Sequence, residues 1–352
     1  MAERRETRPV SVGAIIIGGG APVAVQSMTN TDTRDVDATL AQIHELAGAG
    51  CEIARVAVPH ADSLDAFERI CAASPLPVVA DIHFDHRLAV EATRRGAAKL
   101  RINPGNIGAT GRVDAVIDAA GEAGIPIRIG VNAGSLAAEY ADRDWPLPEK
   151  LVASAQSFCE HFSARGFEDI VVSAKASSVQ PTVEAYRLLA DRVPYPLHIG
   201  VTEAGTVRSG TVKSAVGLGI LIAEGIGDTL RVSLTAPPVE EVHVAWEILA
   251  ALDVRRRGPE LVSCPTCGRC QVDLVPIATE VERRLAATDA PLKVAVMGCA
   301  VNGPGEAREA DVGIAAGRGV GLLFAHGEVV RKVPEAEIVD ALMAEVERLG
   351  AE

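Results

Sequence analysis

Short β-branched runs alternate with longer Ala-rich segments along most of the chain, from about residue 23 to residue 234. Each run is followed by a polar or Gly/Pro-containing loop and then by apolar residues at helical spacing, which is the pattern of repeated βα units. Eight such units predict a TIM (β/α)8 barrel, with a doubly wound open sheet as the alternative. The predicted strands are residues 23–28, 53–58, 78–83, 98–103, 127–132, 170–175, 197–202 and 230–234.

The repeat ends at the charged segment "ALDVRRRGPEL" (residues 251–261), which contains a Gly-Pro pair. The remaining residues, about 90 of them, have their own mixed pattern of helices and strands, which predicts a small α+β domain. We therefore expect a barrel domain that binds the substrate at 1–255 and a second domain at 256–352. A chain of 352 residues suits a barrel of about 250 residues followed by such a module.

Composition narrows the classes of function. The formal net charge is −13 and aromatic residues make up only 3% of the chain, which argues against a nucleic-acid-binding protein. No uncharged apolar stretch reaches the length of about 18 residues that a membrane span needs. Near the N-terminus, Glu3, Glu6 and the break at Gly18–Pro22 argue against a signal peptide and favour two short strands around a turn. We expect a cytoplasmic protein with reduced thiols.

Polar residues occupy alternate positions of the predicted strands, where a strand buried on both faces would be continuously apolar. Such side chains point into a barrel and reach its C-terminal mouth. They are Arg55, Asp81, His83, Arg101, Asn103, Arg128, Asn132, Lys175, His198, Arg231 and Ser233. Individually, each is as readily explained by a loop cap or an internal ion pair.

Five of these residues are cations, and Asp81 and Asp85 are the obvious counter-charges. Unpaired buried cations are costly, whereas Arg side chains match phosphate oxygens well, so the set predicts an anionic substrate that carries phosphate. The cations are Arg55, Arg101, Arg128, Lys175 and Arg231. "DIHFDH" (residues 81–86) also allows a divalent metal on Asp81, His83 and Asp85, although substrate binding or acid–base chemistry explains it equally well.

The seven cysteines fall into two groups. Cys51, Cys71 and Cys159 are isolated among apolar neighbours and are predicted to be buried free thiols. The other four, Cys264, Cys267, Cys270 and Cys299, gather in two segments of the second domain. A redox Cys-x-x-Cys, a zinc site and a ferredoxin-like cluster each fit part of this spacing, and spacing alone does not decide between them.

The second cysteine segment, "GCAVNGPGEA", adds a carboxylate. Gly303, Pro304 and Gly305 predict a tight irregular turn that carries Glu306 back toward Cys299. A carboxylate is a harder ligand than a thiolate, so one iron of a cluster bound by three Cys and one Glu would differ from the others.

Several segments together resemble the 4-hydroxy-3-methylbut-2-enyl diphosphate synthase family of the methylerythritol phosphate pathway. The resemblance extends over roughly residues 10–340. The segments are "VQSMTNT", "VADIHFD", "LRINPGNIG", "IPIRIGVNAGSL", "GVTEAG", "AEGIGDTLRVSL", "CPTC" and "GCAVNGPGEA". The resemblance implies the bacterial two-domain form of an enzyme that reductively opens the ring of 2-C-methyl-D-erythritol 2,4-cyclodiphosphate and releases water.

The resemblance also implies a [4Fe-4S] cluster bound by Cys264, Cys267, Cys299 and Glu306, with Cys270 outside the ligand set. It further implies reduced flavodoxin or ferredoxin as electron donor and a head-to-tail homodimer. In that enzyme the barrel cations would hold the cyclic diphosphate, assisted by Asn103, Asn132, Ser233 and Arg257.

Glu203, just past the seventh predicted strand, is the expected acid–base residue beside Glu306, with Asp81, His83 and His198 in support. Two other functions are considered. One is a pterin-synthase-like barrel transferase with a zinc-stapled appendage, which leaves Glu306 without a role. The other is an iron–sulfur carrier without enzyme activity, which leaves the five strand-end cations unexplained.

Overall fold

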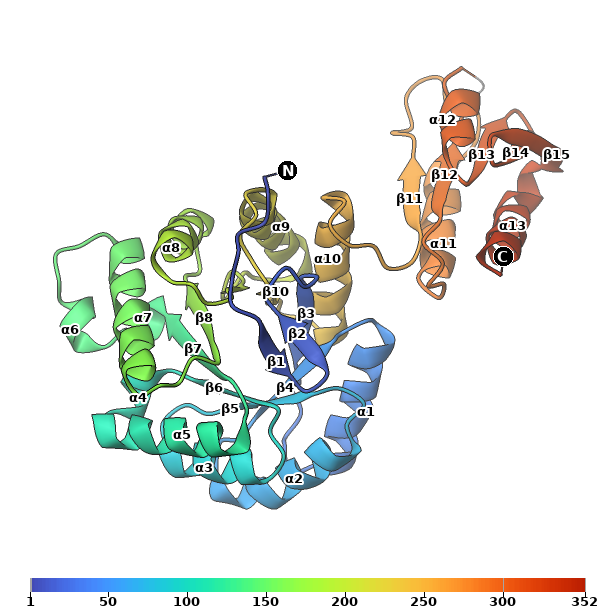
Figure 1. The fold of residues 1–352 in the computed structure, drawn as a ribbon. Coiled ribbons are helices and arrows are strands. Elements are labelled where there is room, and N and C mark those ends of the chain that lie inside the picture. The colour runs from blue at the N-terminus through green and yellow to red at the C-terminus, as the bar shows by residue number, and fades with distance from the viewer. Residues whose placement is uncertain (1, 300, 352) are drawn as a thin grey trace. The chain divides into compact units, whose positions relative to one another are not determined.

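The computed structural model describes residues 2–299 and 301–351, which divide into two compact units, Met1–Arg255 and Arg256–Glu352. Figure 1 shows the helices and strands of each unit. None of the helices in the described part of the chain is both long enough and apolar enough to cross a membrane.

The first unit is built on eight parallel strands in the order β8-β7-β6-β5-β4-β3-β10-β9. A parallel bridge between Val172 and Leu197 joins the two outermost strands, β8 and β9, and brings the sheet round into a barrel. The prediction of a TIM barrel with these eight strands is confirmed. The strands are β3 (Ala24–Met28), β4 (Ile53–Ala57), β5 (Val78–Asp81), β6 (Lys99–Ile102), β7 (Ile127–Asn132), β8 (Ile170–Lys175), β9 (His198–Ile199) and β10 (Thr229–Leu230).

Helices surround this sheet (Figure 1). Outward-facing strand residues such as Val56, Leu100 and Val172 pack with helix residues such as Phe67 and Phe162 in one buried apolar cluster. The inward-facing positions are thereby left free for polar side chains. The helices are α1 (Val36–Gly48), α2 (Leu64–Ala73), α3 (His86–Arg94), α4 (Pro104–Ile107), α5 (Thr110–Ala123), α6 (Ala138–Ala141), α7 (Leu147–Ala164), α8 (Val179–Arg192), α9 (Val207–Ala223) and α10 (Pro238–Ala251), with 3-10 turns η1 (Ala61–Ser63) and η2 (Ala133–Ser135).

An N-terminal hairpin, β1 (Val10–Val12) paired with β2 (Ile15–Ile17), covers the beginning of the barrel strands. Val12 and Ile17 pack against Ala24, Ile53 and Val79, which lie at or near the first residues of their strands. Strands β2 and β3 flank the Gly18–Pro22 break as expected, but β2 pairs with β1. Because this end is filled by apolar side chains, ligands reach the polar interior from the C-terminal end.

The second unit is a five-stranded sheet in the order β11-β12-β13-β14-β15. The first three strands are parallel and the last three are antiparallel. Helices α11 and α13 pack on one face through Val281 and Leu342, and α12 packs on the other through Ala307. The elements are β11 (Glu260–Ser263), α11 (Leu274–Leu285), β12 (Lys293–Met297), α12 (Gly303–Glu309), β13 (Val312–Gly317), β14 (Val320–Ala325), β15 (Glu328–Pro334), η3 (Glu335–Glu337) and α13 (Ile338–Gly350).

Candidate active site

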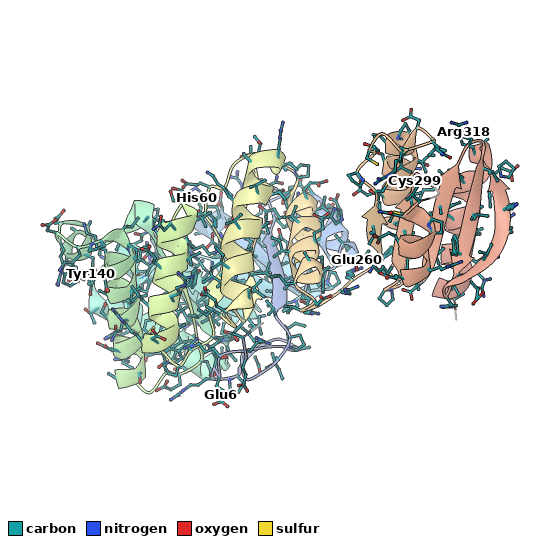
Figure 2. All side chains as sticks on the ribbon, turned by 90° about the horizontal axis from the view of Figure 1, so that it is seen from above. Glu6, His60, Tyr140, Glu260, Cys299 and Arg318 are labelled. Carbon is teal, nitrogen blue, oxygen red and sulfur yellow. The ribbon has the colours of Figure 1, made fainter. Side chains whose placement is uncertain are left out.

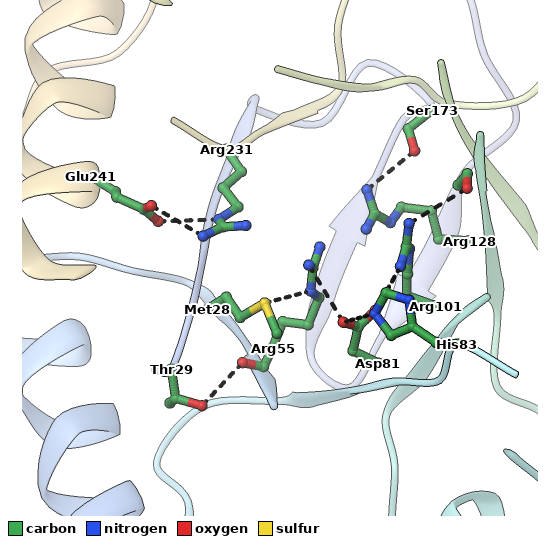
Figure 3. A network of polar contacts seen from close by, with 11 residues as sticks. Met28, Thr29, Arg55, Asp81, His83, Arg101, Arg128, Ser173, Arg231 and Glu241 are labelled. Carbon is green, nitrogen blue, oxygen red and sulfur yellow. Dashed lines mark hydrogen bonds and ion pairs between the residues drawn. The ribbon is translucent and has the colours of Figure 1, made fainter. Parts of the chain in front are cut away.

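Asp81, at the end of β5, is the centre of a polar network inside the barrel (Figure 3). Its Oδ1 accepts a hydrogen bond from Arg101 Nη1 at 3.1 Å, and its Oδ2 lies 3.1 Å from His83 Nε2 and 3.5 Å from Arg55 Nη2. Burial alone would raise the pKa of this carboxyl, but Arg55, His83 and Arg101 outweigh burial and hold the pKa well below its usual range. Asp81 is therefore ionised and orients the two guanidiniums.

Two further cations, Arg128 and Lys175, are buried, and neither pairs with a carboxylate among the described residues. Arg128 Nη1 donates to Ser173 Oγ at 3.2 Å, and Lys175 lies across Gly200, where an added Cβ would be 2.5 Å from Nζ. Burial, and then the neighbouring arginines, lower the pKa of both side chains. Because each charge is costly where it lies, a bound anion would stabilise both of them.

Arg231, just past β10, pairs with Glu241 of α10 (Figure 3). Its Nε donates to Glu241 Oε2 at 3.1 Å and its Nη2 donates to Oε1 at 3.0 Å. The prediction that Asp85 is a counter-charge at the mouth was wrong. Asp85 instead caps α3, where it accepts from the Arg87 amide at 3.0 Å and pairs with the Arg87 guanidinium at 2.7 Å.

Lys99 adds a sixth cation to the barrel interior. It is fully buried on β6, and its Nζ donates to Gln26 Oε1 at 3.3 Å. In the part of the barrel that the structure describes, six inward cations therefore meet two carboxylates, Asp81 and Glu241. An excess of this kind fits a ligand with several negative charges. The six cations are Arg55, Lys99, Arg101, Arg128, Lys175 and Arg231.

Neutral polar groups lie among these cations. With the Asn132 amide oriented to satisfy its neighbours, its oxygen accepts from Arg101 Nη2 at 3.1 Å. His198 is fully buried, and neither ring nitrogen has a hydrogen-bond partner in the described part of the chain. Burial and then Lys175 lower the pKa of His198 well below its usual value, so the ring is neutral. Unpaired buried donors and acceptors of this kind mark a place for water or ligand.

Asn103 and Ser233 occupy the rim of the barrel. Asn103 is buried and its Nδ2 donates to the Ser135 carbonyl at 3.1 Å and the Ser135 hydroxyl at 3.0 Å. This amide group therefore fixes the loop after β7. Ser233 is half-buried beyond β10, two residues after Arg231.

Two other predicted residues lie apart from this network. Glu203 is exposed in the loop after β9 and has a left-handed backbone with φ of 52°. Such a conformation is unfavourable for a residue with a side chain, and residues held in it are enriched at functional sites. Arg257 belongs to the second unit, where its Nε donates to Asp289 Oδ1 at 3.1 Å.

In the second unit, the sheet brings the two cysteine segments to one edge. Strands β11 and β12 are parallel neighbours, so Cys264, which follows β11, and Cys299, which follows β12, lie at the same end of the sheet. The Gly298 amide donates to Cys264 Sγ at 3.4 Å. Figure 2 shows Cys299 among the elements of this unit.

Cys299 and Glu306 lie on either side of the start of α12. The backbone amides of residues 302, 301 and 303 lower the pKa of the Cys299 thiol, which favours the thiolate that binds metals. The predicted irregular turn at Gly303–Gly305 was wrong, because α12 already begins at Gly303. Pro304 suits the first turn of a helix, where an amide hydrogen is not needed. Glu306 therefore projects from a helix.

Cys267 is exposed, and Cys270 is half-buried with its Sγ donating to the Val272 carbonyl at 3.3 Å. The Cys270 sulfur also packs directly on Gly298, where an added Cβ would overlap it. Among the described residues, no three or more His, Cys, Asp or Glu side chains are grouped so as to hold a metal ion. The set of Cys264, Cys267, Cys299 and Glu306 stays a prediction. Thiols on two adjoining loops nevertheless fit the donors that an iron–sulfur cluster uses.

The isolated cysteines are ordinary structural thiols. Cys51 and Cys159 are buried as predicted, whereas Cys71 is half-buried. Burial raises the pKa of each thiol to about 12, so none of the three is a reactive thiolate.

Sequence reasoning missed Glu241 and did not count Lys99 among the cations. Glu241 lies on a helix, so the alternation of strand residues carried no signal for it, and the neighbouring Glu240 made the pair resemble an ordinary acidic helix start. Lys99 occupies one of the alternate positions of its strand that point into the barrel, and this position could have identified it as an interior cation.

Residues 7–246 match the family model described as the GcpE TIM-barrel domain, and residues 260–348 match the GcpE protein C-terminal domain. Two curated relatives are named 4-hydroxy-3-methylbut-2-en-1-yl diphosphate synthase (flavodoxin). The relative from Geobacter sulfurreducens is 60% identical over 350 residues, which cover 99% of each chain. The relative from Symbiobacterium thermophilum is 55% identical over 353 residues, which cover 100% of this chain and 95% of the relative.

Solved structures of dihydropteroate synthases share the barrel. The Yersinia pestis structure has a TM-score of 0.51 at 13% identity and covers 70% of this chain and 97% of its own. The Xanthomonas albilineans structure has a TM-score of 0.50 at 15% identity with the same coverage. At such low identity the likeness extends to the fold alone, so it does not favour the pterin-synthase alternative. Together, the two matched domain models and the full-length relatives show that the chain belongs to the GcpE family, and they confirm the resemblance seen in the sequence.

Proposed function

We propose that this chain catalyses the reductive ring opening and dehydration of 2-C-methyl-D-erythritol 2,4-cyclodiphosphate to 4-hydroxy-3-methylbut-2-enyl diphosphate. The reaction consumes two electrons and releases one water. The names of the full-length relatives support this product and a flavodoxin donor. The structural observation that carries the proposal is the barrel interior, where six cations meet two carboxylates above an end filled by apolar side chains.

The barrel cations have two tasks in this reaction. They bind the cyclic diphosphate through its phosphate oxygens, for which guanidinium groups are well suited. When the carbon–oxygen bond of the ring breaks, the phosphate that is released gains a negative charge. Fixed cations stabilise that developing charge without reorganising, which lowers the barrier. Arg101 and Arg55 are already oriented by Asp81, and Arg128 by Ser173.

A [4Fe-4S] cluster bound by Cys264, Cys267, Cys299 and Glu306 would supply the two electrons, one at a time. The adjoining ends of β11 and β12 support this ligand set. Reduced flavodoxin or ferredoxin would reduce the protein in turn, and both the enzyme and its donor are expected in the cytoplasm.

Loss of water requires a proton for the departing hydroxyl group. Asp81 is a poor donor because its cationic neighbours keep it ionised. Glu203 lies in the loop after β9, at the end of the barrel where ligands enter, and is exposed there. We assign the proton transfer to Glu203.

We further propose that the protein works as a head-to-tail homodimer in which a second copy completes each active site. The substrate cations and the proposed cluster ligands belong to two separately compact units, so one site must draw on both. Helix α9 supports self-association, because Val212, Val216 and Ile220 recur every four residues and form an exposed apolar stripe.

The proposal is tested with protein purified without oxygen. Iron, acid-labile sulfide and zinc are measured first, and the cyclic diphosphate is then added with dithionite and a redox mediator. We expect iron and sulfide in equal amounts and conversion of the substrate. Zinc without sulfide would support the transferase alternative, and an intact cluster without substrate consumption would support the carrier alternative.

A further inference from the structure

Glu241 has the most complete set of contacts of any carboxylate near the mouth. It is 4% exposed. Its Oε1 accepts from Arg231 Nη2 at 3.0 Å and from the Leu234 amide at 3.1 Å. Its Oε2 accepts from Arg231 Nε at 3.1 Å and from Ser27 Oγ at 2.9 Å. One side chain of α10 thus connects strand β3, the segment after β10 and the Arg231 guanidinium.

This pairing leaves part of Arg231 free to bind a ligand. Glu241 contacts the edge of the guanidinium formed by Nε and Nη2, and no contact is found for Nη1 among the described residues. A guanidinium has five N–H donors in a fixed plane, so pairing along one edge leaves the opposite edge available for phosphate oxygens. Glu241 therefore orients Arg231 without occupying all of its donors.

The contacts of Glu241 are also difficult to reproduce with another side chain. All four groups that face it are donors, and a carboxylate is acceptor-only. A glutamine at this position would direct its own amide hydrogens at one pair of these donors. The guanidinium would then lose one of its two fixed points and its orientation.

We propose that Glu241 is a positioning residue for the substrate: it holds Arg231 so that the free edge of the guanidinium meets the diphosphate. This proposal rests on the proposed function, since it presumes that Arg231 binds a substrate phosphate. Glu241 itself touches neither the substrate nor the reacting atoms.

The test is a double-mutant cycle on the anaerobically purified full chain. KM and kcat for the cyclic diphosphate are measured for the wild type, Glu241→Gln, Arg231→Met and the double variant. We expect Glu241→Gln to raise KM about tenfold, the effect of losing one oriented charge contact, and to lower kcat as well, because the barrel cations also stabilise the charge that develops in the reaction. In the Arg231→Met background the same substitution should leave KM unchanged, because the residue through which it acts is gone.

Glu52→Gln is the matched control. Glu52 also pairs along two N–H groups of an arginine, Arg255, at 2.7 and 3.0 Å, and accepts from the Val25 amide at 2.8 Å. It lies directly before β4, at the opposite end of the barrel from Arg231. This substitution should lower the melting temperature and leave KM at the wild-type value. Glu241→Asp, which keeps the charge, should restore part of the lost affinity.

Three outcomes separate the inference from the proposed function. If Arg231→Met raises KM but Glu241→Gln does not, the positioning role is wrong and the substrate assignment stands. If the two substitutions raise KM additively, Glu241 acts independently of Arg231 and the inference is also wrong. If Arg231→Met leaves KM unchanged, the proposed role of the barrel cations fails first.

Discussion

His198 illustrates what burial does to a single titratable residue. It is fully buried beside Lys175, Arg128 and Lys99, and its pKa is lowered well below the usual 6.5. Below pH 6.5 the unfolded chain binds a proton at this residue that the folded chain does not bind. The free energy of unfolding must therefore fall as the pH falls, by up to about 1.4 kcal/mol per pH unit from this residue.

The corresponding prediction compares the wild type with His198→Gln. Urea unfolding at pH 7.5 and pH 5.5 should show a smaller loss of stability between the two pH values for the variant, because glutamine does not titrate. Equal losses in both proteins would mean that His198 is protonated in the folded state and that the charge balance described for the barrel is wrong.

Glu306 is predicted to be the carboxylate ligand of the cluster. Glu306→Ala should give protein with a labile cluster and little turnover, because one iron would lack its protein ligand. The measurement is iron and sulfide content after anaerobic gel filtration. Cys270→Ser is the control. Because Cys270 lies outside the proposed ligand set, this variant should keep its iron. Equal iron loss in both variants would require a different ligand assignment.

The inward polar residues were predictable one by one because a barrel strand alternates strictly between its two faces. That rule placed Asp81, Arg101 and Arg128 correctly within the barrel. The alternation rule could not predict Glu241, because its contact with Arg231 depends on how α10 packs against the strands. It also misassigned Asp85, because a carboxylate just beyond a strand serves equally well as a helix cap.

At the level of elements, glycines within or directly after the strands make room for long cations. Gly130 faces the interior from β7, and an added Cβ would lie 2.7 Å from Arg101 Nε and 3.2 Å from its Nη2. An added Cβ at Gly200 would likewise lie 2.5 Å from Lys175 Nζ. Glycine within a strand often marks such a close approach.

Gly130→Ala should therefore displace the Arg101 guanidinium from Asp81 and raise KM for the cyclic diphosphate several-fold. Gly121→Ala is the matched control, because its Cβ would meet only Phe167 at an ordinary 3.8 Å and alanine favours the helix by about 0.5–1 kcal/mol. An unchanged KM for Gly130→Ala, with a crystal structure showing Arg101 in place, would refute the steric argument.

Helices and strands were predictable where the periodicity of apolar residues was strong. Their prediction failed where that periodicity was absent. All eight barrel strands were located from their β-branched runs. Strand β11 was not predicted, because its first two residues, Glu260 and Leu261, belong to the charged Gly-Pro segment. Helix α12 was missed since Gly303, Pro304 and Gly305 are as typical of turns as of a helix start.

For the whole molecule, the dimer proposal predicts complementation between two inactive variants. Arg128→Met disables the barrel and Glu306→Ala disables the cluster ligand set. When the two variants are unfolded, mixed and reconstituted together, a head-to-tail dimer should regain roughly a quarter of wild-type activity, because half the dimers are mixed and each contains one intact site. If every site lies within one chain, the mixture will stay inactive.

The division of the chain into two units was predictable, because each unit has its own pattern of apolar and polar residues. The βα repeat identified the barrel, and the change of pattern at residues 251–261 indicated a second unit from residue 256, which is where the second compact unit of the structure begins. Function was not predictable from either unit alone. The barrel indicated an anionic ligand, and the cysteines allowed a redox, zinc or iron–sulfur site. Only the ordered set of motifs joined the two units in one reaction.

The most direct test of the proposed reaction is the number of electrons consumed for each product formed. Anaerobically purified protein is reduced with a measured amount of dithionite, given the cyclic diphosphate and analysed for 4-hydroxy-3-methylbut-2-enyl diphosphate. The proposed reaction requires two electrons for each product, and no product should form from protein depleted of sulfide. Product formation without electron consumption, or by protein that contains zinc and no sulfide, would contradict it.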